Sequence, residues 1–427
     1  MLSFGSVFAG AKRIAQTSAT LTETGFGWLL GKRPPAPMFL RQTFEKLGTT
    51  YIKLGQFIAS SPSLFPEDYV REFQKCLDQT TPIPYSAVVK ILREEFGDPH
   101  KIFLDIDSTP MASASIAQVH AGKLRDGTPV VLKIQKPGVK DVMLADLSFL
   151  YAGTKVLELL IPNFKRMSLS GILEDISTTI LQECDFELEA QHLVKFGEFL
   201  QKMDLTGVAT VPKTFPEAST ARVLTMERLY GVPMTDLESI RQVTSNPEET
   251  LIRALNVWMS SLMLCDFFHA DLHAGNLLVL RDGRIGFIDF GIVGKIQKKT
   301  WRSMNQLMVA LNTRNYKLAA QSLIGIGAAD ENANKERFSQ ELKALFEGMD
   351  QLAAKIQTGD LTVDQTRAQE LMLQMAKIGE RNGIKFPREF ALLIKQFLYF
   401  DRYIRLLAPE LDMIQDPRIQ RMIESND

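Results

Sequence analysis

The spacing of apolar residues along the chain changes from a helical to a strand-like period and back again. Over residues 38–104, apolar positions recur every three to five residues, which predicts helices. The stretches 116–124 and 130–135 instead read as strands, and the Asp126-Gly127 pair between them is typical of a hairpin turn. The pattern therefore predicts a helical extension followed by a small β-containing region.

Helical spacing returns over residues 141–202, with a break at 161–163 where Pro162 cannot donate a backbone hydrogen bond. Strand patterns reappear at 207–212 and 222–227. Beyond residue 230 the pattern is mainly helical. The exception is a second hairpin, whose strands at 276–280 and 284–289 flank Asp282-Gly283. We therefore expect an α+β fold in which a small β-containing lobe precedes a larger helical lobe.

Composition supports a folded chain and argues against several functional classes. Of the 427 residues, 45% are hydrophobic and 23% are charged, which is typical of globular proteins. The 49 Lys and Arg residues balance 50 Asp and Glu residues, so we expect no nucleic-acid partner. Cys76, Cys184 and Cys265 lie far apart and form no C-x-x-C motif, which favours a reducing compartment.

No apolar stretch is long and uncharged enough to predict a transmembrane helix. Residues 1–37 are rich in small residues, and we expect them to form a mobile leader. Within them, Lys12-Arg13 and Lys32-Arg33 lie near aromatic residues, so contact with an anionic membrane surface is an alternative. The prediction is a cytoplasmic protein, with peripheral membrane association left open.

The most informative cluster of polar residues is the loop 268–276, followed by Asp289-Phe290-Gly291. Asp271 and Asn276 are five residues apart, and a short hairpin separates them from Asp289. Carboxylate and amide oxygens suit Mg²⁺, and this order of Asp, Asn and Asp-Phe-Gly is typical of phosphoryl transfer. His269 and His273 offer a weaker zinc alternative, because no third soft ligand is evident.

Lys133 lies among apolar residues on a predicted inner strand and needs an anionic partner there, since an unpaired buried ammonium group is costly. Four acidic residues on the helix predicted downstream are candidates. At about 100° per residue, that helix would align Glu183 with Glu187 and Asp185 with Glu189. Spacing alone does not select among these pairs.

A loop of small residues precedes the strand at 116–124, in the place where ordinary protein kinases carry a glycine-rich phosphate loop. It contains Ala112, Ser113, Ala114 and Ser115 but no glycine. The Cβ atoms restrict the backbone and hinder close approach to phosphate, although the serine hydroxyls can compensate. Taken alone, this stretch is typical of a simple turn.

Taken together, these motifs resemble the UbiB-like atypical kinases, also called the AarF or coenzyme Q-associated family. The resemblance covers about residues 38–300 and rests on six segments in the expected order: Lys53-Leu-Gly-Gln56, Ala112–Gln118, Val131–Gln135, Glu183-Cys-Asp185, His269–Asn276 and Asp289–Gly291. It implies a bilobal, protein-kinase-like α+β fold with a helical N-terminal extension packed over the active site.

The resemblance also implies roles for single residues. Lys133 corresponds to the lysine that holds the α- and β-phosphates of ATP, with Glu189 as its partner. Asp271 corresponds to the catalytic aspartate, and Asn276 and Asp289 to the Mg²⁺ ligands. We expect the remaining ATP contacts from the small-residue loop and from a hinge beneath adenine, at Ala112, Ser113, Ala114, Ser115, Met226, Glu227 and Leu229.

In this family a K-x-G-Q signature occupies the cleft that would otherwise take a protein substrate. Lys53 and Gln56 match it, close to the positions that match Glu183 and Asp185. The chain departs from the family at the catalytic loop, where Leu272 and Ala274 replace two prolines, and at the small-residue loop, where Ser113 and Ala117 replace the usual Ala and Gly. No Ala-Pro-Glu motif follows Asp289.

We therefore expect a Mg²⁺- and ATP-dependent kinase or ATPase linked to quinone or isoprenoid lipid metabolism. Two alternatives stay open: a protein kinase that acts in trans, and a catalytically silent, nucleotide-sensing scaffold for quinone-biosynthetic proteins. The expected organisation is a leader (1–37), a helical extension (38–104), a β-containing lobe (105–229) and a helical lobe (230–427).

Overall fold

The computed structural model describes the following residues: 13, 15–20, 22, 24, 34–59, 65–75, 81–161, 169–357, 371, 374–375, 377–379, 381–384, 388–411 and 416–419. The chain divides into two compact units. The first comprises Met1–Trp258, Asp271–Val293 and Leu398–Asp427, and the second comprises Met259–Ala270 and Gly294–Phe397. The boundaries predicted at residues 104 and 229 both fall inside the first unit.

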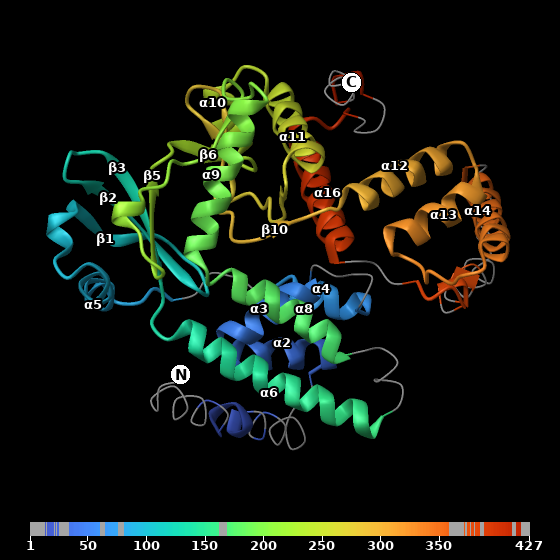
Figure 1. The fold of residues 1–427 in the computed structure, drawn as a ribbon, viewed down its shortest axis with the longest axis horizontal. Helices are drawn as coiled ribbons and strands as arrows, with labels where there is room; N and C mark the ends of the chain where they lie inside the picture. The colour runs from blue at the N-terminus through green and yellow to red at the C-terminus, as the bar shows by residue number, and fades with distance from the viewer. Residues whose placement is uncertain are drawn as a thin grey trace. The chain divides into compact units, whose positions relative to one another are not determined.

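After the helical residues at 13, 15–20, 22 and 24, the first unit contains α2 (Ala36–Leu47), α3 (Thr49–Ala59), α4 (Glu67–Phe73) and α5 (Tyr85–Phe96). A four-stranded sheet follows, in the order β1-β2-β3-β5, from β1 (Phe103–Ser113), β2 (Ala117–Leu124), β3 (Pro129–Gln135) and β5 (Val223–Glu227). Between β3 and β5 the chain forms α6 (Val139–Leu160), α8 (Leu169–Gln182), α9 (Phe186–Lys202) and the short strand β4 (Ala209–Thr210) (Figure 1).

A second four-stranded sheet of this unit has the order β4-β9-β8-β6, with β6 at Gly231–Pro233, β8 at Leu277–Leu280 and β9 at Ile285–Phe287. The helices α10 (Leu237–Val243) and α11 (Pro247–Leu264) lie between β6 and β8 in sequence. Both predicted hairpins are present, and Gly127 and Gly283 adopt the positive φ angles of +87° and +83° that their tight turns require.

The second unit is largely helical and contains α12 (Lys298–Asn312), α13 (Tyr316–Ile326) and α14 (Lys335–Gln357). The remaining named elements are the short strands β7 (Phe268–His269) and β10 (Val293–Gly294), the helix α16 (Arg388–Leu407) and the 3-10 helices η1 (Pro99–Lys101) and η2 (Pro216–Ala218). The apolar faces of α12, α13 and α14 meet in a common core that includes Ala310, Ala320, Phe338 and Leu342.

The prediction for residues 105–115 was incomplete, because β1 is an eleven-residue strand there. Its exposed positions carry Asp105 and Asp107, Pro110 interrupts it, and its pairing with β2 is irregular, so no clean alternation marks it in the sequence. Ala112 and Ser113 therefore end a strand rather than form a loop.

The helix predicted over 141–202 has a second break that the apolar pattern does not show. α8 ends at Gln182, and α9 begins at Phe186 with Asp185 as its N-cap, where the Asp185 carboxylate accepts the Leu188 N–H at 2.9 Å. The predicted alignment of Glu183 with Glu187 is therefore wrong, because the two residues do not belong to one continuous helix.

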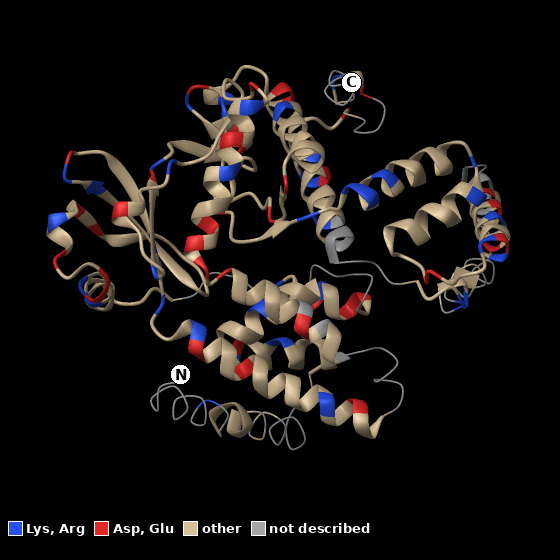
Figure 2. Cartoon of the chain, in the orientation of Figure 1, with Lys and Arg blue, Asp and Glu red and all other residues tan. Residues whose placement is uncertain are grey.

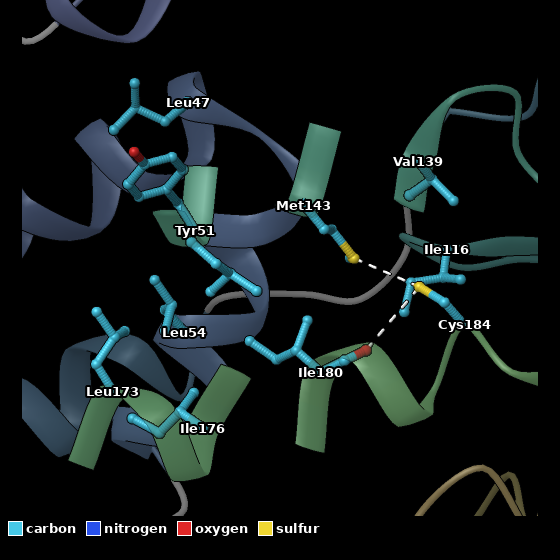
Figure 3. Close-up of a cluster of buried hydrophobic side chains, with 11 residues drawn as sticks. Leu47, Tyr51, Leu54, Ile116, Val139, Met143, Leu173, Ile176, Ile180 and Cys184 are labelled. Atoms are coloured by element: carbon cyan, nitrogen blue, oxygen red, sulfur yellow. Dashed lines mark hydrogen bonds between the residues drawn. The ribbon is translucent and has the colours of Figure 1, made fainter. Parts of the chain in front are cut away.

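A buried apolar cluster holds α3 against α6 and α8. Figure 3 shows its members converging from these helices, from α2 and from Ile116 just before β2, with the Cys184 thiol 3.5 Å from the Met143 sulfur. Burial raises the pKa of Cys184 to about 11, so this thiol is a packing residue rather than a nucleophile. The cluster therefore holds in place the helix α3, which carries Lys53.

A buried carboxylate ties the start of the chain to the same helices. Asp146 on α6 is only 1% exposed and accepts hydrogen bonds from Arg13 at 2.9 and 2.8 Å, from Thr50 at 2.8 Å and from Thr17 at 3.3 Å. Within the predicted leader, residues 13 and 15–20 are thus helical and anchored. Most of the rest of the leader, including Lys12, Lys32 and Arg33, lies outside the described residues.

Candidate functional site

The centre of the candidate site is a lysine held between two carboxylates. Period-two alternation on β3 buries Leu132 and Ile134 on one face and turns Lys133 to the other. The Lys133 ammonium lies 2.8 and 2.9 Å from the carboxylate oxygens of Glu189 on α9 and 2.9 Å from Asp289 Oδ2. The pairing of Lys133 with Glu189 that the resemblance implied is therefore present in the structure.

The pKa values of these two carboxyl groups are shifted in opposite directions. Burial, together with the charge of Asp289, raises the pKa of Glu189 to about 8. Burial also disfavours the charged form of Asp289, but the nearby Lys133 outweighs it and lowers the pKa of Asp289 to about 2. Asp289 is therefore a permanent negative charge, and its side chain is still 42% exposed and open to a ligand.

Asp289 adopts an unusual backbone conformation for a residue other than glycine. Its φ angle is +63°, and its Oδ1 accepts the Gly291 N–H at 3.2 Å. Asp tolerates this region better than most residues, and such strain gathers at functional sites. Just after β9, the backbone thus turns the Asp289 carboxylate toward Lys133.

The loop before β8 is fixed by hydrogen bonds from its own residues and from α16. Asn276 Nδ2 donates to the Asp271 carbonyl at 2.9 Å, and the Asn276 N–H donates to the His273 carbonyl at 2.8 Å. The Tyr403 hydroxyl donates to the Leu272 carbonyl at 2.6 Å. Because the Asn276 amide nitrogen is used within the loop, its oxygen is the atom that suits a cation.

Lys133, Asp271 and Asp289 line a cavity of about 60 Å³ inside the first unit, to which the helical extension also belongs. Its lining comprises Lys53, Ala114, Ser115, Ile116, Ala117, Lys133, Glu183, Asp271, His273, Asp289, Gly291 and Ile292. Seven residues predicted from the sequence therefore converge here: Lys53, Ala114, Ser115, Lys133, Glu183, Asp271 and Asp289.

Lys53 on α3 forms an ion pair with Glu183 at 2.7 Å, and both side chains are mostly buried, at 12% and 16% exposure. The small-residue loop is closed by a hydrogen bond from the Ala114 N–H to the Ala117 carbonyl at 2.9 Å. This turn uses a backbone donor that a glycine-rich loop would offer to phosphate.

Several predicted residues do not line this cavity, and Glu189 and Asn276 are among them. Asp185 caps α9, while Ala112 and Ser113 end β1. Met226 and Glu227 lie in β5, where Glu227 accepts the Lys213 N–H at 3.2 Å. Leu229 follows that strand, and Gln56 lies one helical turn after Lys53 on α3.

For His273 the sequence left open a weak zinc role or an orienting or core role. The structure places its side chain at the cavity beside Asp271. Among the described residues, no three or more His, Cys, Asp or Glu side chains gather in a metal-binding cluster. The oxygen donors of Asn276 and Asp289 fit Mg²⁺ better than the zinc alternative.

Comparisons with known proteins agree with this geometry. Residues 75–323 match the model of the ABC1 atypical kinase-like domain. An uncharacterized aarF domain-containing protein kinase of Arabidopsis thaliana, described as chloroplastic, is 49% identical over 400 residues, covering 90% of this chain and 74% of its own. An uncharacterized protein of Mycobacterium tuberculosis is 36% identical, covering 96% of this chain and 83% of its own.

A probable protein kinase UbiB of Shewanella frigidimarina is 30% identical over 88% of this chain and 67% of its own. Among solved structures, Rv3197 of Mycobacterium tuberculosis, in complex with erythromycin, covers 95% of both chains with a TM-score of 0.50 and 22% identity. The expected α+β, bilobal kinase-like fold is confirmed. The chain therefore belongs to the ABC1, or UbiB-like, family of atypical kinases.

Proposed function

We propose that the protein binds Mg²⁺ and ATP and acts as a phosphotransferase or ATPase. The observation that carries this proposal is the placement of Lys133 between Glu189 and Asp289 at the cavity that Asp271 also lines. Kinase-like sites need a fixed cation for the phosphates, oxygen ligands for Mg²⁺ and a base beside the transferred group. All three kinds of group are present here.

In this proposal, Lys133 holds the α- and β-phosphates, and Asp271 accepts a proton from a hydroxyl group or orients a water molecule. The oxygens of Asn276 and Asp289 would hold Mg²⁺. Bound Mg²⁺ supplies charge neutralisation of the phosphate oxygens. Lys133 is held by its two partners before ATP arrives, so little reorganisation is needed when the phosphates bind.

We also propose that the acceptor is a small molecule of quinone or isoprenoid metabolism, or water, rather than a protein. The Lys53–Glu183 ion pair lines the same cavity as Asp271, which disfavours entry of a polypeptide segment. The link to quinones rests on the relatives named UbiB. A quinone-headgroup analogue that raises ATP turnover would support it, whereas efficient phosphorylation of a generic protein would favour a kinase acting in trans.

Asp271→Asn tests the catalytic proposal against the silent scaffold. We expect ATP turnover to fall by about 10²- to 10⁴-fold, because a general base contributes about that much. ATP binding should persist, measured as nucleotide-induced thermal stabilisation. Asp266→Asn is the matched control, since it makes the same change at an exposed position five residues upstream. Nucleotide binding without turnover in the unaltered protein would favour the scaffold.

None of the described helices is long and apolar enough to cross a membrane. We propose peripheral contact with anionic lipid, carried by α12 rather than by Arg13, which is paired with Asp146. Residues 290–329 contain no acidic residue. Figure 2 shows basic residues at the start of α12. The basic residues of this segment are Lys295, Lys298, Lys299 and Arg302, which are exposed and form no ion pair with any described residue.

Neutralising Lys298, Lys299 and Arg302 with Gln should lower partition onto anionic vesicles by about a hundredfold, since each cation near such a surface contributes about 1 kcal/mol. Co-flotation with vesicles at low and high salt measures this. The matched control neutralises Lys317, Lys335 and Lys343, which are exposed lysines in the same unit. Equal flotation of the two triple variants would exclude α12 as the contact surface.

A further inference from the structure

The imidazole of His273 has a defined tautomer in this structure. Its Nδ1 lies 3.1 Å from the backbone nitrogen of Gly275, which donates its N–H to the ring. A ring nitrogen that accepts a hydrogen bond carries no proton, so the proton of the neutral imidazole resides on Nε2. His273 therefore presents a hydrogen-bond donor on the side of the ring away from Gly275.

That donor lies near the candidate base. Nε2 of His273 lies 3.9 Å from Oδ2 of Asp271, and both side chains line the same cavity. This separation is too long for a hydrogen bond, and catalytic hydrogen bonds that are long in a ligand-free structure tighten in the substrate complex. The side chains of His273 and Asp271 are 46% and 21% exposed, so a substrate can reach both.

Gly275 makes this ring position possible. A Cβ atom added at Gly275 would lie 3.0 and 3.1 Å from the Cε1 and Nδ1 atoms of His273, closer than most such contacts. The backbone beneath is held by the bonds from Asn276 to the carbonyls of Asp271 and His273. The imidazole and the carboxylate thus project from one rigid turn.

We propose that His273 is a positioning residue for Asp271. In the substrate complex its Nε2–H donates to Oδ2 of Asp271 and so sets the orientation of the carboxylate toward the acceptor group. His273 keeps its proton throughout, and Asp271 receives the proton of the acceptor. This inference rests on the proposed function and adds to it a residue that sets the orientation of the base.

Two substitutions in the full-length protein distinguish a His273 that orients Asp271 from a His273 that only stabilises the loop. In the His273→Gln variant, the side-chain amide nitrogen reaches about as far as Nε2 of histidine does, so a hydrogen-bond donor is kept. His273→Asn keeps only an acceptor near the Nδ1 position, for the Gly275 N–H. We expect His273→Asn to lower kcat by about 10- to 100-fold, as for a lost hydrogen bond to a charged group, with KM for ATP unchanged. His273→Gln should restore most of kcat.

The opposite pattern, with Asn active and Gln impaired, would show that His273 only supports the loop and would overturn the proposal. Equal loss in both variants, or no loss in either, would overturn it as well. ¹⁵N NMR of the imidazole, assigned with His273→Asn, gives a readout that needs no turnover. The Nε2–H tautomer is expected, and the Nδ1–H tautomer would contradict the inference. Absence of ATP turnover in the unaltered protein would instead count against the proposed function.

Discussion

Asp289→Asn is expected to lower Mg²⁺-dependent ATP turnover by about a thousandfold or more, because a metal ion contributes several kcal/mol to such a transition state. Lys133 keeps the pKa of Asp289 at about 2, so the native residue is a carboxylate at every physiological pH. Asparagine preserves the shape of that side chain but removes its charge. Turnover measured across a Mg²⁺ titration should show both a lower maximum and a higher half-saturating concentration.

The fold should survive this change, because Lys133 retains both hydrogen bonds to Glu189. Asp282→Asn is the matched control, since Asp282 is an exposed carboxylate on the neighbouring β8–β9 turn, paired with Arg284 at 2.7 Å. Its turnover should equal that of the unaltered protein. If Asp289→Asn retained the native Mg²⁺ dependence, Asp289 would not be a metal ligand.

The second large effect concerns stability. Asp146→Ala should lower the free energy of unfolding of the first unit by about 3–5 kcal/mol, the usual cost of breaking a buried ion pair by removing one partner. The substitution leaves Arg13, Thr17 and Thr50 without their shared acceptor in a site that is 1% exposed at Asp146. Urea unfolding followed by circular dichroism should show an earlier transition.

Asp141→Ala on the same helix is the control for this experiment. Asp141 is exposed in the first turn of α6, so its removal should change the free energy of unfolding by less than about 1 kcal/mol. A midpoint for Asp146→Ala that matches the Asp141→Ala midpoint would show that the buried network adds little to stability.

The catalytic loop and its hairpin could be predicted because their chemistry is local. Asp271, Asn276 and Asp289 lie within one loop–strand–turn–strand segment, and two strand patterns with an Asp-Gly turn mark it in the sequence. The lysine on β3 was equally clear, since a charged residue amid apolar ones needs a partner.

The assignment of the acidic residues depended on a break that the apolar pattern did not show. With a continuous helix, Glu183 and Glu187 would share a face. The turn between α8 and α9 ends the first helix, so the helical spacing no longer relates these two residues. The structure gives three acids three roles: Glu183 pairs with Lys53, Asp185 caps α9 and Glu189 pairs with Lys133. A signal was available in Asp185, which is a favourable N-cap residue.

The ion pair between Lys53 and Glu183 extends the candidate site beyond the segment that matches the family domain. The segment that matches the family domain begins at residue 75, whereas Lys53 lies before it on α3. A recombinant fragment limited to the matched domain would therefore lack one wall of its own cavity and would leave Glu183 without its cation. The unit that folds around this site is larger than the unit that sequence comparison delimits.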